Sequence, residues 1–157
     1  MKQFNNKTIT KSFTIVEVLI FVTLISLIFI TISYIITFSL KNTKINEHKI
    51  LATHYAEELK EWLRGEKEDD WNIFTTKGHV SGSQWCVNTI PIDISTLVGG
   101  PCGLDYSLHN NTFKRDLTLT NNVSPNPTQV TVNIIVEWKE DNNIYTIPIN
   151  TVFSLWE

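Results

Sequence analysis

Formal charge is missing from a long stretch near the start of the sequence. Residues 18–40 contain no Lys, Arg, Asp or Glu, and they also lack Pro and Gly, the two residues that most disfavour a helix. A helix of these 23 residues would be roughly 35 Å long at about 1.5 Å per residue. That length is enough to cross the hydrocarbon core of a bilayer with some tilt. The sequence therefore predicts one transmembrane helix.

Other absences exclude whole classes of function. The sequence has no G-x-S-x-G motif, no Walker loop, no Rossmann fingerprint and no cysteine with a convincing histidine partner, so we predict no enzymatic activity and no cofactor. The C-x-x-C and H-x-x-x-H spacings of metal sites are missing as well, and we predict no metal site. From residue 41 onward 10 basic residues stand against 15 acidic ones, a net charge of −5 that opposes direct binding of nucleic acid.

A short basic segment precedes the apolar stretch. Residues 1–12 carry Lys2, Lys7 and Lys11 and no acid, which by the positive-inside rule predicts a cytoplasmic N-terminus. The apolar stretch is longer than the core of an ordinary secretory signal, and no A-x-A-like cleavage site follows it. We therefore expect a single-pass protein of the cytoplasmic (inner) membrane whose C-terminal part is exported. A plain signal anchor would have the same features.

Glu17 is a lone carboxylate one turn inside the apolar segment. Such a charge costs about 2.5–3.5 kcal/mol at the middle of a bilayer and less near the interface. Because no cation occurs in residues 18–40, its partner must lie elsewhere. Lys11 could reach it by snorkelling, and the residues around Glu17 suggest a second explanation.

The run Ser12-Phe13-Thr14-Ile15-Val16-Glu17, followed by some twenty apolar residues, resembles the type IV prepilin signature. The resemblance implies that residues 1–12 are a leader and that a prepilin peptidase cleaves between Ser12 and Phe13. It also implies N-methylation of Phe13 and a subunit-assembly role for Glu17, whose carboxylate would neutralise the α-amine of a neighbouring subunit. This chain has Ser12 where the family usually has Gly.

The helix is predicted to continue beyond the membrane. Apolar residues recur at steps of three and four on one face of residues 41–65. These residues are Ala52, Tyr55, Ala56, Leu59, Trp62 and Leu63. Gly65 follows as the expected C-terminal cap, and the acidic run 66–70 is expected to be a solvated loop. We thus predict one helix with a transmembrane half, residues 13–40, and an amphipathic half, residues 41–65.

Residues 66–157 are predicted to form a globular head built on a β-sheet. Three segments alternate apolar and polar residues with the period of a strand. They are Phe113–Thr120, Val130–Trp138 and Tyr145–Phe153, with a hairpin turn within Lys139–Asn143 and Pro148 at an edge position. Residues 71–111 are expected to be loop-rich with short strands. The predicted fold is α+β, a long N-terminal helix packed on a three- to four-stranded antiparallel sheet.

The two cysteines fall in the part that we expect to be exported, where disulfides persist. Fifteen residues separate Cys86 from Cys102, and closing a loop of that size stabilises a protein by about 3 kcal/mol on the chain-entropy model. We predict this disulfide. Two free buried cysteines and a metal site with the flanking histidines are the alternatives.

The head extends the resemblance to minor pilins of the PilV type and pseudopilins of the GspI type. The shared plan is an Ala- and Glu-rich helix end, a Trp, a Cys pair, a Phe-x-Arg strand and two further strands, each ending near a Trp. The matching residues are Ala56–Leu59, Trp71, Cys86, Cys102, Phe113–Arg115, Val130–Trp138 and Trp156.

Several expectations follow from this resemblance. It implies assembly into a type IV pilus-like or type II secretion filament at the cell surface or in the periplasm. The implied partners are prepilin peptidase, other pilin or pseudopilin subunits through the N-terminal helix, an inner-membrane assembly platform, and membrane lipid before assembly. Many major pilins have a Pro in the membrane helix that this chain lacks, which favours an accessory subunit. The alternative is a signal-anchored envelope protein whose exported domain binds a ligand or partner.

Overall fold

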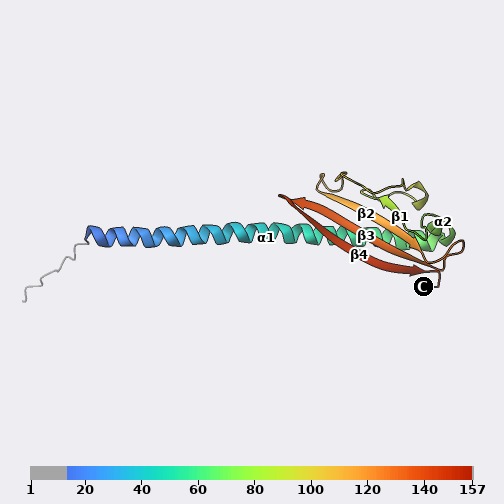
Figure 1. The fold of residues 1–157 in the computed structure, drawn as a ribbon, viewed down its shortest axis with the longest axis horizontal. Coiled ribbons are helices and arrows are strands. Elements are labelled where there is room, and N and C mark those ends of the chain that lie inside the picture. The colour runs from blue at the N-terminus through green and yellow to red at the C-terminus, as the bar shows by residue number, and fades with distance from the viewer. Residues whose placement is uncertain (1–13, 157) are drawn as a thin grey trace, which may run out of the picture. The chain divides into compact units, whose positions relative to one another are not determined.

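The structure is a computed structural model that describes residues 14–156 and divides into two compact units. The first unit ends at Thr43 and the second begins at Lys44. The elements in chain order are α1 (Ile15–Asp69), α2 (Trp71–Thr76), β1 (Ser83–Cys86), the 3-10 turn η1 (Ile94–Thr96), β2 (Phe113–Asn121), β3 (Gln129–Glu140) and β4 (Asn143–Ser154) (Figure 1). The predicted cleavage residues Ser12 and Phe13 lie outside the described residues.

The first unit contains the apolar part of α1, and none of its described residues is buried. Among residues 14–156, α1 is the one helix long and apolar enough to cross a membrane. Its hydroxyl groups bond within the helix: Thr23 Oγ1 donates to the carbonyl of Ile20 at 2.8 Å, and Ser33 Oγ donates to the carbonyl of Phe29 at 2.8 Å. Internal bonds of this kind satisfy polar groups where no water is available.

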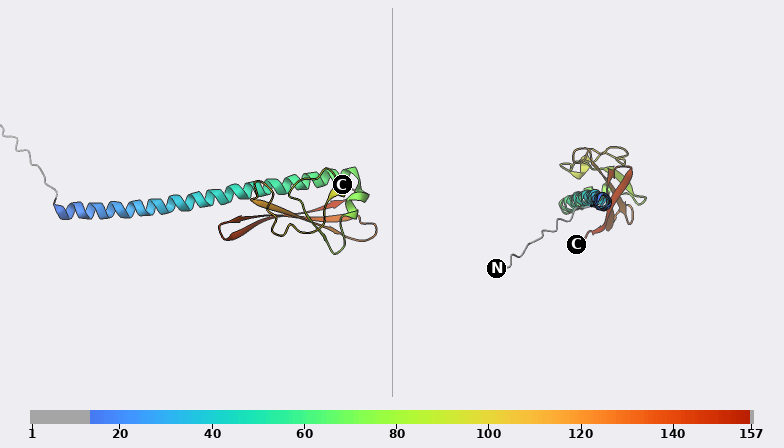
Figure 2. Two further views of the ribbon diagram at one scale, coloured as in Figure 1. Left: turned by 90° about the horizontal axis from the view of Figure 1, so that it is seen from above. Right: turned by 90° about the vertical axis from the view of Figure 1, so that its left-hand side faces the viewer.

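The second unit packs the C-terminal half of α1 on an antiparallel sheet with strand order β1-β2-β3-β4. Both ribbon views show this half of the helix running along one face of the sheet (Figures 1 and 2). The predicted helical face is confirmed, because Ala52, Ala56, Leu59 and Leu63 are all fully buried. The segregated helix and sheet make the predicted α+β arrangement.

The three long strands also match the sequence pattern. Side chains of β2 and β3 alternate between the core and the outer face of the sheet, as a period of two requires. The core-facing residues include Phe113, Leu117, Val132, Ile134 and Trp138, each at most 2% exposed. The strand β4 pairs only with β3 and is an edge strand, so the predicted edge position of Pro148 is confirmed.

Two expectations about the end of α1 were wrong. The helix does not stop at Gly65 but runs on to Asp69, so the acidic run is mostly helical and not a loop. Tertiary contacts offset the helix cost of about 1 kcal/mol for a Gly. Lys67 is buried beside the ring of Phe153, with its Nζ atom 5.9 Å from the ring centroid, and a Glu66 carboxylate oxygen accepts the N–H of Ile94 at 2.8 Å.

Asp70 begins the short helix α2 in a region that the sequence predicted to be loop-rich. Its carboxylate accepts the backbone N–H groups of Asn72 at 2.8 Å and Ile73 at 3.0 Å, which is N-capping geometry. Phe74 of this helix is fully buried, and the indole N–H of Trp71 donates to the carbonyl of Pro127 at 3.1 Å. The helix is therefore held by the core and by the loop before β3.

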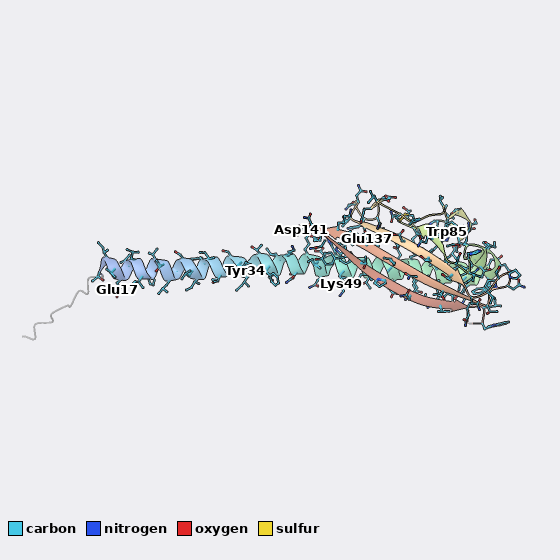
Figure 3. The ribbon with its side chains drawn as sticks, in the orientation of Figure 1. Glu17, Tyr34, Lys49, Trp85, Glu137 and Asp141 are labelled. Atoms are coloured by element: carbon cyan, nitrogen blue, oxygen red, sulfur yellow. A yellow bond between two sulfur atoms is a disulfide. The ribbon has the colours of Figure 1, made fainter. Side chains whose placement is uncertain are left out.

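The β3–β4 hairpin closes through a two-residue turn inside the predicted segment Lys139–Asn143. Glu140 pairs with Asn143, which leaves Asp141 and Asn142 as the turn. Asp141 has a φ of 53°, in the left-handed region that Asp tolerates better than most residues. Figure 3 shows Asp141 at the end of this hairpin.

Candidate functional site

Glu17 lies in the first turn of α1, and its side chain projects from the helix (Figure 3). The residue is exposed, and its backbone N–H donates to Thr14 Oγ1 at 3.3 Å, so Thr14 helps to begin the helix. The side chains around it are apolar and exposed, including Val18 at 51% and Phe21 at 63%. Within residues 14–156 no cation pairs with Glu17. The local chemistry is one carboxylate in an apolar surface, which can accept a cation.

The second unit contains the disulfide that the sequence predicted. Cys86 at the end of β1 is bonded to Cys102, and none of the described cysteines is free. Cys102 is buried, and its backbone N–H donates to the carboxylate of Asp116 at 2.6 Å. The disulfide therefore fastens the segment after η1 to the outer face of β1 and β2.

Residues 102–107 continue from the disulfide along that outer face, and we call them the strap. Lys114 Nζ donates to the carbonyl of Gly103 at 2.8 Å, and the side-chain amide of Asn88 donates to the carbonyl of Asp105 at 3.0 Å. The hydroxyl of Tyr106 donates to the carboxylate of Glu137 on β3. Polar contacts thus hold the strap on the sheet beyond the disulfide.

Tyr106 is the central side chain of the strap. Its ring lies beneath two ammonium groups, with Lys114 Nζ at 5.2 Å and Lys139 Nζ at 4.8 Å from the ring centroid. Burial, followed by the hydrogen bond and the charge of Glu137, raises the pKa of Tyr106 to about 12. The phenol therefore stays protonated and keeps its bond to Glu137 over a wide pH range.

Arg115 connects three parts of the second unit. Its side chain is only 1% exposed, although the neighbouring core residues are apolar. Nε donates to the carbonyl of Val87 at 2.7 Å, and Nη1 contacts the carbonyl of Tyr55 at 2.6 Å and the carboxylate of Glu58 at 3.0 Å. Burial lowers the pKa of Arg115, and Glu58 opposes that shift. The sequence pattern placed Arg115 on the inner face of its strand without indicating these partners.

Glu140 at the end of β3 is a further buried charge, and the sequence did not single it out. Its side chain is 8% exposed, and its carboxylate contacts two side chains of α1, Lys44 Nζ at 2.7 Å and His48 Nδ1 at 2.8 Å. Glu140 continues the alternation that ends at Trp138, so it points to the core side of the sheet. The sequence signal that could have identified Glu140 is its position two residues after Trp138, on the side of the strand that otherwise carries apolar residues.

The residues selected from the sequence do not form one site. Glu17 belongs to the first unit, and Cys86 and Cys102 belong to the second. In the part of the chain that the structure describes, no group of three or more His, Cys, Asp or Glu side chains is placed to hold a metal ion.

Comparisons of the chain with protein-family models, with curated proteins and with solved structures found no match.

Proposed function

We propose that the chain is a minor pilin or pseudopilin, a subunit that is processed by prepilin peptidase and assembled into a type IV pilus-like or type II secretion filament. The observation that carries the proposal is Glu17, a carboxylate without a cation partner within residues 14–156, at the start of an exposed apolar helix and five residues after Ser12. A helix of this kind near the N-terminus suits a membrane anchor or signal.

The proposed mechanism is assembly and not catalysis. Before assembly, membrane lipid covers the apolar side chains of the first unit, which are exposed along its described residues. Cleavage before Phe13 creates an α-amine, and Glu17 of a neighbouring subunit neutralises it. At an effective dielectric constant of 20, two unit charges 4 Å apart attract by about 4 kcal/mol. This pairing would set the axial offset between subunits, while neighbouring helices replace the lipid around α1.

The processing step tests the proposal. The protein is extracted from membranes of cells with and without a prepilin peptidase, and its N-terminus is sequenced. We expect the mature chain to begin at Phe13, methylated, only in the cells that contain the peptidase. Ser12→Phe should block cleavage because the bulky side chain replaces the small residue, whereas Ser12→Gly should be cleaved at least as fast. An intact Met1 in peptidase-competent cells would contradict the proposal.

The main alternative is a signal-anchored envelope protein whose exported head binds a ligand or a partner. The apolar helix and the disulfide suit that function equally well. Processing separates the two, because a signal anchor keeps its N-terminal segment in cells with the peptidase.

A further inference from the structure

The carboxylate of Glu140 has a different nitrogen group beside each of its two oxygens. Lys44 Nζ lies 2.7 Å from Oε1, and His48 Nδ1 lies 2.8 Å from Oε2. Both residues belong to α1, one turn apart, and both lie in the second unit with Glu140. The His48 side chain is 17% exposed, and the Glu140 side chain is 8% exposed. Water therefore screens this pair only weakly.

The two contacts respond differently to pH. Lys44 keeps its charge at neutral pH, and its hydrogen bond to Glu140 raises its pKa further. Histidine is the side chain that ordinarily changes charge between pH 5 and 8. Neither His48 Nδ1 nor Glu140 Oε2 has a well-aligned hydrogen bond within residues 14–156. An attraction between these two atoms at 2.8 Å therefore requires a charged imidazole ring. If the ring is neutral, a buried carboxylate oxygen has neither a hydrogen bond nor an opposite charge beside it.

The surroundings of the pair include aromatic rings, charged side chains and a second histidine. The His48 ring meets the edge of Phe113, with centroids 5.5 Å apart. The titratable and charged groups near the pair are Lys44, Glu47 and Tyr55 from α1, His109 from the loop before β2, Tyr145 from β4 and Asp141 from the hairpin turn. Among these His109 is the second histidine. It contacts the Phe113 and Tyr55 rings, and no carboxylate is among its contacts in the described residues.

The pair holds one end of the sheet. Glu140 is the last residue of β3 and pairs with Asn143 across the hairpin turn. Farther along the head the sheet is tied to α1 by the apolar core and by the contact of Arg115 with Glu58. Loss of the His48 contact therefore weakens the attachment of the hairpin end first, while the core stays packed.

We propose that His48 and Glu140 form a proton-dependent latch that holds the β3–β4 hairpin against α1 when the imidazole is protonated. A charged imidazole attracts the carboxylate across this contact, and a neutral imidazole does not. The latch therefore requires both the charged ring and the charged carboxylate. It weakens when either group becomes neutral. The proposal depends only on contacts within the second unit and is independent of the proposed function.

Hydrogen–deuterium exchange of the full-length protein in detergent micelles tests the latch. Amides of residues 138–146 are compared at pH 5.5 and pH 7.5 after correction for intrinsic exchange rates. We expect protection of this hairpin to be about fivefold higher at pH 5.5, as for a partly buried ion pair of ordinary strength. His48→Gln should remove the difference. His54→Gln is the matched control, because His54 is an exposed histidine of the same helix whose ring lies beside that of Tyr55.

Other variants separate a latch from simple loss of packing. Lys44→Gln should lower the protection of the hairpin amides at both pH values and leave the ratio of protection at pH 5.5 to that at pH 7.5 unchanged. Glu140→Gln should also lower protection, but the two pH values should then give equal protection. If His48→Gln keeps the pH difference, or if His54→Gln abolishes it, the proposal is wrong. If His48→Gln does not fold, NMR titration of the native protein decides the question. The hairpin amides and the His48 ring must then titrate with one midpoint, and separate midpoints overturn the latch.

Discussion

The apolar part of α1 and the head use the same residue types and bury them in opposite degrees. Ile30 in the first unit is 66% exposed and Phe29 is 65% exposed, whereas Ile134 and Phe113 of the sheet are fully buried. Burial thus depends on what a fold places beside a residue and not on the residue alone. The head supplies its own core, but the first unit has exposed apolar side chains along its described length. Its length and apolar surface suit a membrane anchor or a signal.

The two regions also treat carboxylates differently. Glu140 and Glu58 of the head have cations of the same chain beside them, Lys44 at 2.7 Å and Arg115 at 3.0 Å. Glu17 has none within residues 14–156. A buried or membrane-placed charge needs a partner, and the head supplies one to each of these two carboxylates. Four variants test this contrast, from the largest expected effect to the smallest.

Replacing the lone carboxylate should have the largest effect. We expect Glu17→Ala to insert into the membrane normally and to fail to enter filaments, because the α-amine of the neighbouring subunit loses its counter-charge. Val18→Ala, an adjacent change without a charge, should assemble as the native chain does. The measurement is the fraction of protein in sheared filaments against the fraction in membranes. Native levels of Glu17→Ala in filaments would refute the pairing role.

A matched pair of leucines tests whether only the head depends on its own core. Leu59 is fully buried and Leu27 is 61% exposed. We expect Leu59→Ala to lower the free energy of unfolding of the head by about 2–5 kcal/mol through lost burial and a cavity. Leu27→Ala should leave it unchanged. Urea unfolding in micelles, followed by tryptophan fluorescence, gives both values. Equal effects would mean that the two regions share a core.

Removal of the disulfide should weaken the head by about 3 kcal/mol, because the unfolded chain is freed from a closed loop. The variant is Cys86→Ser combined with Cys102→Ser, measured by the same urea unfolding. Reductant should lower the free energy of unfolding of the native protein toward that of the double variant. It should leave the free energy of unfolding of the double variant unchanged. Thiol labelling of the unreduced native protein would contradict the disulfide.

The strap should give the smallest effect, and only in alkaline solution. The pKa of Tyr106 is about 12 in the folded head against an ordinary value of about 10. The folded state therefore holds the phenol proton more tightly, so this contribution to stability is complete below about pH 10 and lost as the pH approaches 12. Tyr106→Phe should reduce the fall of the melting temperature over that range. Tyr34→Phe in the first unit is the control and should not. An unchanged alkaline fall in Tyr106→Phe would exclude this role.

Much of the fold was accessible from sequence because periodicity records which side of an element is covered. Leu59 and Leu63 at helical spacing, and Val132 and Ile134 at strand spacing, predicted the packed faces that the structure contains. The pattern failed at Gly65, where local propensity predicted a helix end. Contacts of Glu66 with Ile94 and of Lys67 with Phe153 extend the helix. These partners are far along the chain, so the residues near Gly65 do not predict the contacts.

The sequence by itself determined the uncharged stretch, the position of Glu17, the two cysteines and the strand faces, because each depends on residues close together in the chain. Only the tertiary structure decided that Arg115 reaches the carbonyl of Tyr55, and that Glu140 lies between Lys44 and His48. These partners are about 60 to 100 residues apart, and a pairing over that distance is set by how the sheet packs on α1. The apolar helix of the first unit could be predicted from composition, because its length and lack of charge depend only on neighbouring residues. The charge pairs of the head could not, because the fold creates their surroundings.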